Sequence, residues 1–329
     1  MLRLFKDAHY DFIGIRRWAY GFSALLIIPG LLWLLATGLN YSVEFTGGTL
    51  IQIRTTTPIG TGAIRTALIN GGVTGAEVQT FGSETEYAVR ARVSAERAGT
   101  EAGTEETVSA VQRALDVGLG NGTYTIVRRE AVGPKVGREL QEKALIAILF
   151  SFVVTLIYLA FRFEWRFGLA AIIATAHDIV ATIAFIRYLN LEVSLVVVAA
   201  VLTIVGYSLN DTIVIFDRVR ENLRKYRRQN LYDILNLSVN ETLPRTILTG
   251  GSTLATALVL SFFAGEVIKP FALVMTFGIL VGTFSSIYVA SPILMGVEAR
   301  WPGEDVRGAR LLGAAGAEPG AGRAPQPAR

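Results

Sequence analysis

Residues 202–217 have the sequence LTIVGYSLNDTIVIFD, a mostly apolar run that carries the carboxylate of Asp211. The run belongs to an apolar block at 193–216, and about 20 mostly apolar residues let a helix cross a hydrocarbon core of about 30 Å. A charged side chain near the centre of such a helix costs about 2.5–3.5 kcal/mol on insertion scales. Asn or Ser would hold helices together without this cost, so Asp211 is the first candidate for a functional residue.

Five other blocks are long and apolar enough to span a membrane: 18–40, 144–161, 167–186, 246–265 and 270–297. Four of the six blocks contain no charged residue, whereas the block at 167–186 carries Asp178. Hydrophobic residues make up 51% of the 329 residues and the mean hydropathy is +0.45, which is too apolar for an ordinary soluble domain. We therefore predict an all-α membrane bundle of six helices, with helix 1 at 18–40 and helices 2–6 within 143–297. The first block lacks a small-residue cleavage pattern and is expected to be a retained span.

Basic residues predict how the chain lies in the membrane, because Lys and Arg near span ends are enriched on the cytoplasmic side. They concentrate on one side of the predicted spans: Arg3, Lys6, Arg16, Arg17, Arg162, Arg166, Arg218, Arg220, Arg224, Lys225, Arg227, Arg228 and Arg245. We expect a cytoplasmic N-terminal segment at 1–17 and a basic cytoplasmic segment at 217–245 that also contacts anionic lipids. The tail at 298–329 is rich in Gly, Ala and Pro and is expected to be disordered and cytoplasmic.

This topology places residues 41–142 outside the cell membrane as one soluble domain. Alternating apolar residues and turn signals predict strands at 49–56, 77–81, 86–93 and 124–132, and helices at 60–70 and 105–117. The order β-α-β-β-α-β is that of an α+β ferredoxin-like domain. The fold class expected is thus a six-helix bundle with a ferredoxin-like periplasmic domain between helices 1 and 2.

Polar side chains follow one face of the fourth span. Thr203, Tyr207 and Asp211 are spaced i, i+4, i+8 and stack along the helix, and Asn210 widens this face. The third and fifth blocks carry comparable polar residues: Thr175, Asp178 and Thr182, and Thr249, Thr253 and Thr256. Such faces have to turn towards each other, a partner or water. For the hydroxyls, hydrogen bonding that only holds helices together is the alternative.

Arg245 follows Pro244 at the expected start of the fifth span, and two roles stay open for it. It is either an anchor in the headgroup region or the counter-charge of Asp211. In the second case burial opposes the charge of the carboxylate while the guanidinium favours it. A carboxylate held between these effects can load and release protons as water access changes. For Asp178 a role in the proton relay and a structural role in hydrogen bonding stay equally open. His177 is expected to be a packing residue.

Several functional classes are excluded or disfavoured. The chain has no cysteine, which excludes disulfides and thiol catalysis, and its two histidines disfavour a zinc centre. It has no GxxxxGK[ST] phosphate loop and no clear nucleophile–base set. We therefore expect a transport subunit without catalytic chemistry of its own, with no cofactor and no nucleic-acid partner, which draws energy from an ion gradient or a partner.

Two glycine pairs predict close backbone contacts. Gly278 and Gly282 form a GxxxG motif, which favours close packing of two helices. Gly47 and Gly48 follow Phe45 and Thr46 where the first span meets the outer domain, and they indicate either a tight turn or a hinge.

Three segments resemble one known family: VEFTGGT at 43–49, VGYSLNDTIVIFDRVREN at 205–222 and NETLPRT at 240–246. Over about residues 10–300 the chain is similar to the SecF family of protein-export membrane subunits, which belongs to the RND superfamily. The segment at 43–49 departs from the family pattern, since Glu44 replaces an aspartate and Ser42 a glycine.

The resemblance implies a bacterial inner-membrane protein that forms a heterodimer with SecD. Together the two subunits would use the proton-motive force to draw unfolded preproteins from the SecYEG translocon on the periplasmic side. It also implies that the residues at the positions of Asp211 and Arg245 take part in proton conduction, and that SecD packs on the face of spans four and five.

Two other functions are compatible with the sequence. A half-size RND exporter of lipids or small hydrophobic molecules would need a large apolar cleft in its outer domain. A passive assembly factor that only stabilises a translocon would work without the charge of Asp211.

Overall fold

The computed structural model describes residues 9–303 except 74, 92–100 and 266. Six helical segments in this part have the length and composition to cross a membrane, which confirms the predicted number of spans. They are α1 (Arg16–Thr37), α5 (Pro134–Arg162), α6 (Trp165–Tyr188), α7 (Leu195–Lys225), α8 (Leu231–Phe263), and the continuous α9 (Lys269–Ser285), η1 (Ser286–Ala290) and α10 (Ser291–Arg300). The predicted disorder of the tail concerns residues that lie almost wholly outside the described part.

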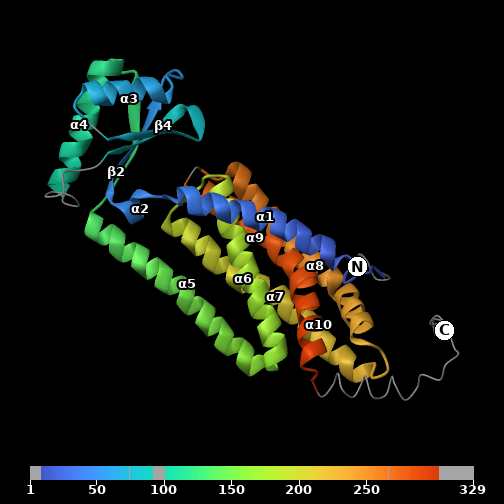
Figure 1. The fold of residues 1–329 in the computed structure, drawn as a ribbon. Coiled ribbons are helices and arrows are strands. Elements are labelled where there is room, and N and C mark those ends of the chain that lie inside the picture. The colour runs from blue at the N-terminus through green and yellow to red at the C-terminus, as the bar shows by residue number, and fades with distance from the viewer. Residues whose placement is uncertain (1–8, 74, 92–100, 266, 304–329) are drawn as a thin grey trace.

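The bundle has two distinct ends (Figure 1). One end carries a small domain with a β-sheet, and we call it the domain end. The other holds Arg162, Arg166 and Arg218, and we call it the basic end. Arg162 pairs with Asp217 at 2.5 Å there. The helix α5 stands apart from the other helices and is the least buried of the later spans.

The domain contains β2 (Gly48–Thr55), α3 (Thr61–Asn70), β3 (Glu77–Phe81), β4 (Ser83–Ala91), α4 (Glu101–Leu119) and β5 (Tyr124–Val132). The strands form an antiparallel sheet in the order β3-β4-β2-β5. Both helices share one core with the sheet, in which Ile51, Ile64 and Leu115 are fully buried. β4 starts at Ser83, earlier than expected, because Gly82 takes a φ of 77° and closes the hairpin in one residue.

The chain passes from the bundle to the domain through a strand of two residues and one helical turn. After β1 (Asn40–Tyr41) comes α2 (Val43–Thr46), and β1 pairs with β6 (Glu192–Val193) in parallel. Phe45 packs against residues of α6 and α7. Gly47 and Gly48 have φ angles of 74° and 125°, which other residues rarely adopt, so the glycine pair forms a tight turn into β2.

The segment expected at 217–245 is mostly helical. α7 continues to Lys225, and α8 starts at Leu231 and runs through Pro244 without interruption. The sequence favoured a helix start near Pro244, because proline removes one helical hydrogen bond. The first turns of α8 bury Ile234 and Leu235 in the large apolar cluster of the basic end, and this burial offsets the missing bond.

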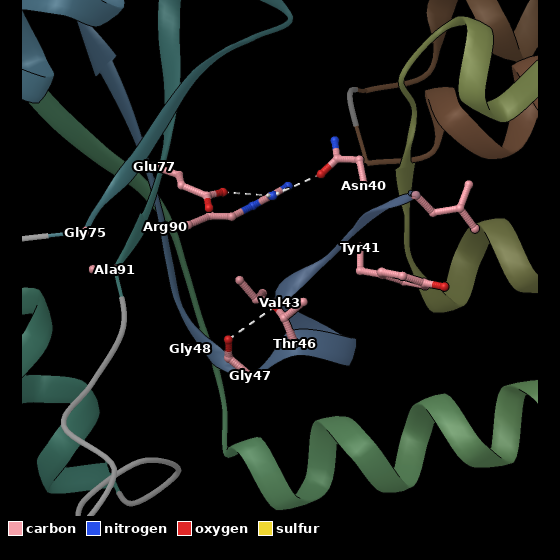
Figure 2. Close-up of a pocket in the computed structure, with 11 residues that line it drawn as sticks. Asn40, Tyr41, Val43, Thr46, Gly47, Gly48, Gly75, Glu77, Arg90 and Ala91 are labelled. Carbon is pink, nitrogen blue, oxygen red and sulfur yellow. Dashed lines mark hydrogen bonds and ion pairs between the residues drawn. The ribbon is translucent and has the colours of Figure 1, made fainter. Parts of the chain in front are cut away.

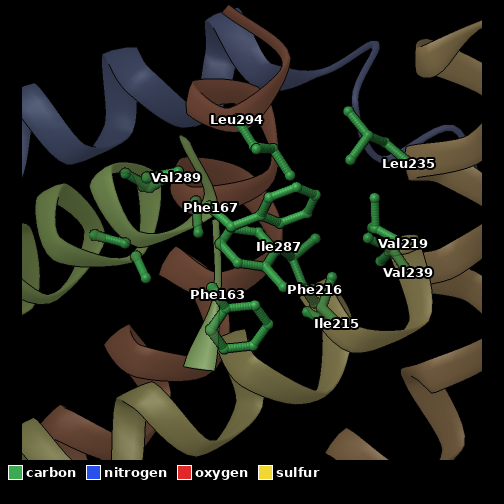
Figure 3. Packing of buried hydrophobic residues seen from close by; sticks show 14 of the residues in the cluster. Phe163, Phe167, Ile215, Phe216, Val219, Leu235, Val239, Ile287, Val289 and Leu294 are labelled. Atoms are coloured by element: carbon green, nitrogen blue, oxygen red, sulfur yellow. The ribbon is translucent and has the colours of Figure 1, made fainter. Parts of the chain in front are cut away.

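The same apolar cluster joins five spans at the basic end, since it also includes Leu159 of α5 (Figure 3). Its centre is aromatic: the ring of Phe216 on α7 lies edge-on to those of Phe163 and Phe167, with centroids 6.4 and 5.5 Å away. Leu294 of α10 and Val239 of α8 close the cluster. This packing fixes the relative positions of α6, α7, α8 and α10.

The segment before α1 lies against the start of α8. The amide of Asn240 accepts from Tyr10 N at 2.9 Å and donates to Tyr10 O at 2.8 Å. One turn earlier, Asn236 Oδ1 accepts from Ile13 N at 3.0 Å, and the Ile13 side chain is fully buried. Two asparagine side chains thus bind the backbone of a segment more than 220 residues away in sequence.

The GxxxG motif packs α9 closely on α7. A Cβ atom at Gly278 would lie 2.2 Å from Ile204 Cδ1, and one at Gly282 would lie 2.9 Å from Ser208 Cβ and 3.2 Å from Ser208 Cα. Ile204 can shift the tip of its side chain, but Ser208 meets the new atom with its backbone. The contact at Gly282 therefore tolerates no side chain without a movement of one helix.

We predict that Gly282→Ala lowers the thermal unfolding midpoint of the detergent-solubilised protein, because overpacking costs about 1–3 kcal/mol. Gly296→Ala is the matched control, since it lies in the same span and a Cβ there would meet nothing within 4 Å. Equal midpoints for the two variants would contradict the close contact of α9 with α7.

Candidate functional site

Asp211 lies inside the bundle, where α7 faces α9. Its side chain is buried, with 3% of the residue exposed. Within the described part of the chain its carboxylate has one hydrogen bond, and this bond is long: Thr283 Oγ1 on α9 donates to Asp211 Oδ2 at 3.5 Å. A buried carboxylate normally has several good donors. Asp211 is therefore weakly paired in this structure.

Tyr207 lies one turn from Asp211 towards the domain end. Its hydroxyl is buried and makes no hydrogen bond of good geometry within the described part of the chain, although the Thr253 hydroxyl on α8 lies near it. A Cβ atom at Gly250 on α8 would lie 3.8 Å from Tyr207 Oη and 3.4 Å from Thr283 Oγ1. Asp211, Tyr207, Gly250 and Thr283 thus surround one small region where α7, α8 and α9 meet.

Arg245 is exposed on α8, and in the described part of the chain no ion pair within 4.0 Å joins it to Asp211. The neighbouring Thr246 is buried, with 2% of the residue exposed. The two residues point to different sides of α8, because neighbours on a helix are about 100° apart. In this conformation the two side chains form no contact ion pair, although the guanidinium is close enough to the carboxylate for a through-space electrostatic interaction.

The predicted polar face of α7 divides in two. Asp211 is buried, whereas Thr203 and Asn210 are exposed on the outside of α7. Four residues turn a helix by slightly more than one revolution, so an i, i+4, i+8 series rotates away from its starting direction. Thr203 Oγ1 donates to Ala199 O at 2.7 Å, which satisfies its hydroxyl within the helix.

On α8 the polar residues also bond within their own helix. Thr253 Oγ1 donates to the carbonyl of Thr249 at 3.0 Å, and both residues are half-buried. Thr256 is exposed and donates to Ser252 O at 3.1 Å. With Arg245, they leave a polar strip on the outside of α8 beside that of α7.

Asp178 on α6 is the centre of a second, well-bonded cluster. Its Oδ2 accepts from Ser208 Oγ on α7 and from Ser285 Oγ on α9, the latter at 2.7 Å. Its Oδ1 lies 3.0 Å from His177 Nδ1, and His177 Nε2 lies 3.0 Å from Ser23 Oγ on α1. This carboxylate therefore joins four helices, and both of its oxygens have hydrogen-bond contacts.

A π-helical turn, η1, follows directly after Ser285. The hydroxyls of Thr212 and Ser286 lie 2.8 Å apart, and Ser291 Oγ donates to Ser286 O five residues earlier. Pro292 offers no amide to the helical ladder, which accounts for the widened turn before it. π-Turns within α-helices frequently occur at functional sites.

Glu44 has a role that its motif did not reveal. Its Oε2 accepts from Leu195 N, the first residue of α7, at 2.6 Å. A carboxylate at a helix N-terminus stabilises the helix by satisfying a free amide and opposing the helix dipole. Glu44 thus ties the segment before Gly47 to the span that carries Asp211.

The domain and the bundle are also joined by an ion pair. Arg90 on β4 lies 2.7 Å from Glu192 and donates to Asn40 Oδ1 at 3.3 Å. The residues around it line a cavity of about 230 Å³, whose walls include Gly47 and Thr46 (Figure 2). This cavity is polar and is not the apolar cleft expected of an exporter of hydrophobic molecules. A larger apolar cavity of about 440 Å³ lies between α5, α6 and α7, lined by Leu145, Ile183 and Val197 among others, and it belongs to the helices and not to the sheet domain.

Sequence reasoning missed Thr283, Ser285 and Ser23. Each lies in a block whose apolar average concealed it, and the contacts depend on how α1, α6, α7 and α9 are rotated against each other. The spacing of Gly282 and Ser285 could have predicted one of these contacts. A residue one helical turn after a close glycine contact faces the same neighbouring helix, so Ser285 is expected to face α7 as Gly282 does.

Comparison with known proteins gives one consistent result. The profile of the C-terminal region of protein export membrane proteins SecD/SecF matches residues 114–300, and the SecD/SecF GG motif matches residues 32–59. The chain is 52% identical over 304 residues to the protein translocase subunit SecF of Gemmatimonas aurantiaca, covering 92% of this chain and 91% of the relative. It is 44% identical over 287 residues to SecF of Vibrio alginolyticus, covering 86% and 89%.

Solved structures agree with these relatives. The crystal structure of SecDF, a translocon-associated membrane protein from Thermus thermophilus, matches with a TM-score of 0.80 and 36% identity over 90% of this chain. SecDF in its super-membrane-facing form matches with a TM-score of 0.65 and 34% identity over 94% of this chain. In both cases the chain covers 40% of the length of the SecDF chain.

We predict that Asp178→Ala destabilises the protein strongly, because each buried group left without a partner costs about 1–3 kcal/mol. Asp178→Asn keeps one acceptor oxygen and should be milder. Thermal unfolding of both variants in the same detergent tests the order. Equal midpoints for wild type and Asp178→Ala would show that the cluster contributes nothing to stability.

Proposed function

The chain belongs to the SecD/SecF family of protein-export membrane proteins, and on this basis we propose that it works as the SecF half of a SecDF unit. In this role it assists preprotein translocation through SecYEG and uses the proton-motive force. The observation that carries the proposal is the buried and weakly paired carboxylate of Asp211 within a span-length helix. A carboxylate that served only to hold helices together would have donors comparable to those of Asp178.

The orientation we propose puts the basic end in the cytoplasm and the sheet domain in the periplasm of the inner membrane. The basic residues at one end support it, because such residues are retained on the cytoplasmic side. We also assign the domain to the ferredoxin-like class. Its element order β-α-β-β-α-β and its strand order β3-β4-β2-β5 support this assignment.

SecD is the partner we propose for the outer face of α7 and α8. Thr203, Asn210, Arg245 and Thr256 are exposed there on the single chain. Polar groups facing lipid hydrocarbon are costly, so a second set of helices is the more favourable cover. Unfolded preprotein and SecYEG would meet the complex on the periplasmic side, and anionic lipids would contact the basic end.

In the proton relay we propose, Asp211 is the group that takes up and releases the proton. Arg245 acts as a mobile counter-charge, which approaches the carboxylate in one state and leaves it in the other. Asn210 extends the path to the outer face of α7. Asp178 extends it inwards through Ser208, which is three residues from Asp211 and donates to Asp178.

We predict that Asp211→Asn reduces preprotein translocation into inverted membrane vesicles with a proton gradient to the level seen without one. The amide keeps the shape of the side chain but cannot change its charge. Asp217→Asn is the control: it removes a carboxylate from the same helix, but one that forms a surface pair with Arg162 worth about 0–1 kcal/mol. Gradient-stimulated export that survives in Asp211→Asn would make the relay assignment wrong.

Arg245→Met is predicted to lower gradient-stimulated export while the unfolding midpoint stays close to that of wild type. The side chain is exposed and has no ion pair with Asp211 in the resting structure, so its loss removes little stability. The vesicle assay and thermal unfolding are measured on the same preparations. Unchanged export would leave Arg245 only the role of a headgroup anchor.

A further inference from the structure

Two hydroxyl groups near Asp211 are buried and unpaired. Among the described residues Thr246 Oγ1 and Tyr207 Oη make no hydrogen bond of good geometry, although the Thr253 hydroxyl lies near Tyr207 Oη. Leaving such a group without a partner costs about 1–3 kcal/mol, and native proteins usually satisfy it with protein or with ordered water. Both hydroxyls belong to the helices that surround Asp211.

Thr246 differs from four other hydroxyl residues of its helix. Thr242, Thr253, Thr256 and Ser261 on α8 each donate to the carbonyl oxygen four residues earlier. Thr246 makes no such bond, although it is equally helical and its residue is only 2% exposed. Its hydroxyl is therefore free to bind another group inside the bundle.

The register of α7 and α8 places this hydroxyl opposite Asp211. The short connection between the helices makes them antiparallel, and the contact of Tyr207 with the Gly250 position fixes their alignment. One turn along α7 from Tyr207 leads to Asp211, and one turn back along α8 from Gly250 leads to Thr246. Both steps cover about 6 Å in the same direction.

We propose that an ordered water molecule binds between Tyr207 Oη, Thr246 Oγ1 and the carboxylate of Asp211, with Thr283 Oγ1 at its edge. The missing side chain at Gly250 leaves room, and a buried water needs two to four polar partners, which these groups supply. The site rests on the proposed role of Asp211 and adds Thr246, Tyr207 and Thr283 to it as positioning residues.

This water is the immediate proton donor and acceptor of Asp211. On loading, one O–H bond of a bound hydronium breaks and one forms at the carboxylate, so that a neutral carboxyl and a neutral water remain. On release the same bonds change in reverse, and no electron is transferred. The two hydroxyls hold the water at hydrogen-bond distance while the outer path opens and closes.

The test is an infrared titration of the Asp211 carboxyl in the full chain reconstituted with SecD in liposomes. Asp211→Asn identifies the band by its disappearance. In Thr246→Val and Tyr207→Phe we expect the titration midpoint to move by about one pH unit or more, as the loss of a hydrogen bond to a charged group implies. Thr256→Val is the matched control, because its hydroxyl is already bonded within α8.

Thr246→Ser restores the hydroxyl and is expected to return both the midpoint and gradient-stimulated export to wild-type values. Midpoints in Thr246→Val and Tyr207→Phe equal to that of Thr256→Val would overturn the water site. That result would leave the relay standing if Asp211→Asn still abolishes gradient-stimulated export. If Asp211→Asn exports normally, the proposed function fails, and the titration midpoints alone decide the water site.

Discussion

The carboxylate of Asp178 is the interaction on which the membrane part of the structure depends. It receives hydrogen bonds from α7 and α9 and reaches α1 through His177, so one buried charge determines how four helices face each other. A polar cluster in a low-dielectric interior is stabilising only when all of its members are bonded. The close approach of Gly282 to Ser208 is what brings these donors within reach.

Asp211 is also a buried aspartate, but it has far fewer hydrogen-bond donors than Asp178. It is as buried as Asp178, but among the described residues only Thr283 donates to it, and Arg245 interacts with it through space without an ion pair. The cluster around Asp178 holds α7 and α9 together, whereas Asp211 between the same two helices has a single long hydrogen bond. In our proposal Asp211 is the group that takes up and releases the proton, whereas Asp178 holds the helices together and extends the relay inwards through Ser208.

Much of the fold could be predicted because apolar length depends only on local sequence. The six spans follow from the apolar blocks, and the order of strands and helices in the domain follows from the alternation of apolar and polar residues and from the glycines at the turns. The start of α8 could not be predicted, because the burial of Ile234 and Leu235 outweighs the effect of Pro244. The partners of Asp178 and Asp211 depend on helix rotation, which one sequence does not record. Helical spacing alone likewise could not show that Asn210 faces outwards while Asp211 faces inwards.

The contact of Asn236 and Asn240 with residues 10–13 has a consequence for sequence divergence. The asparagines bind backbone groups, and the Tyr10 side chain is 56% exposed, so position 10 can change freely among relatives without loss of the attachment. Proline is the exception at positions 10 and 13, since both amides are donors. Position 13 must also stay apolar because Ile13 is fully buried. Attachment of this segment therefore constrains Asn236 and Asn240 more than it constrains the side chain at position 10, whose backbone Asn240 binds.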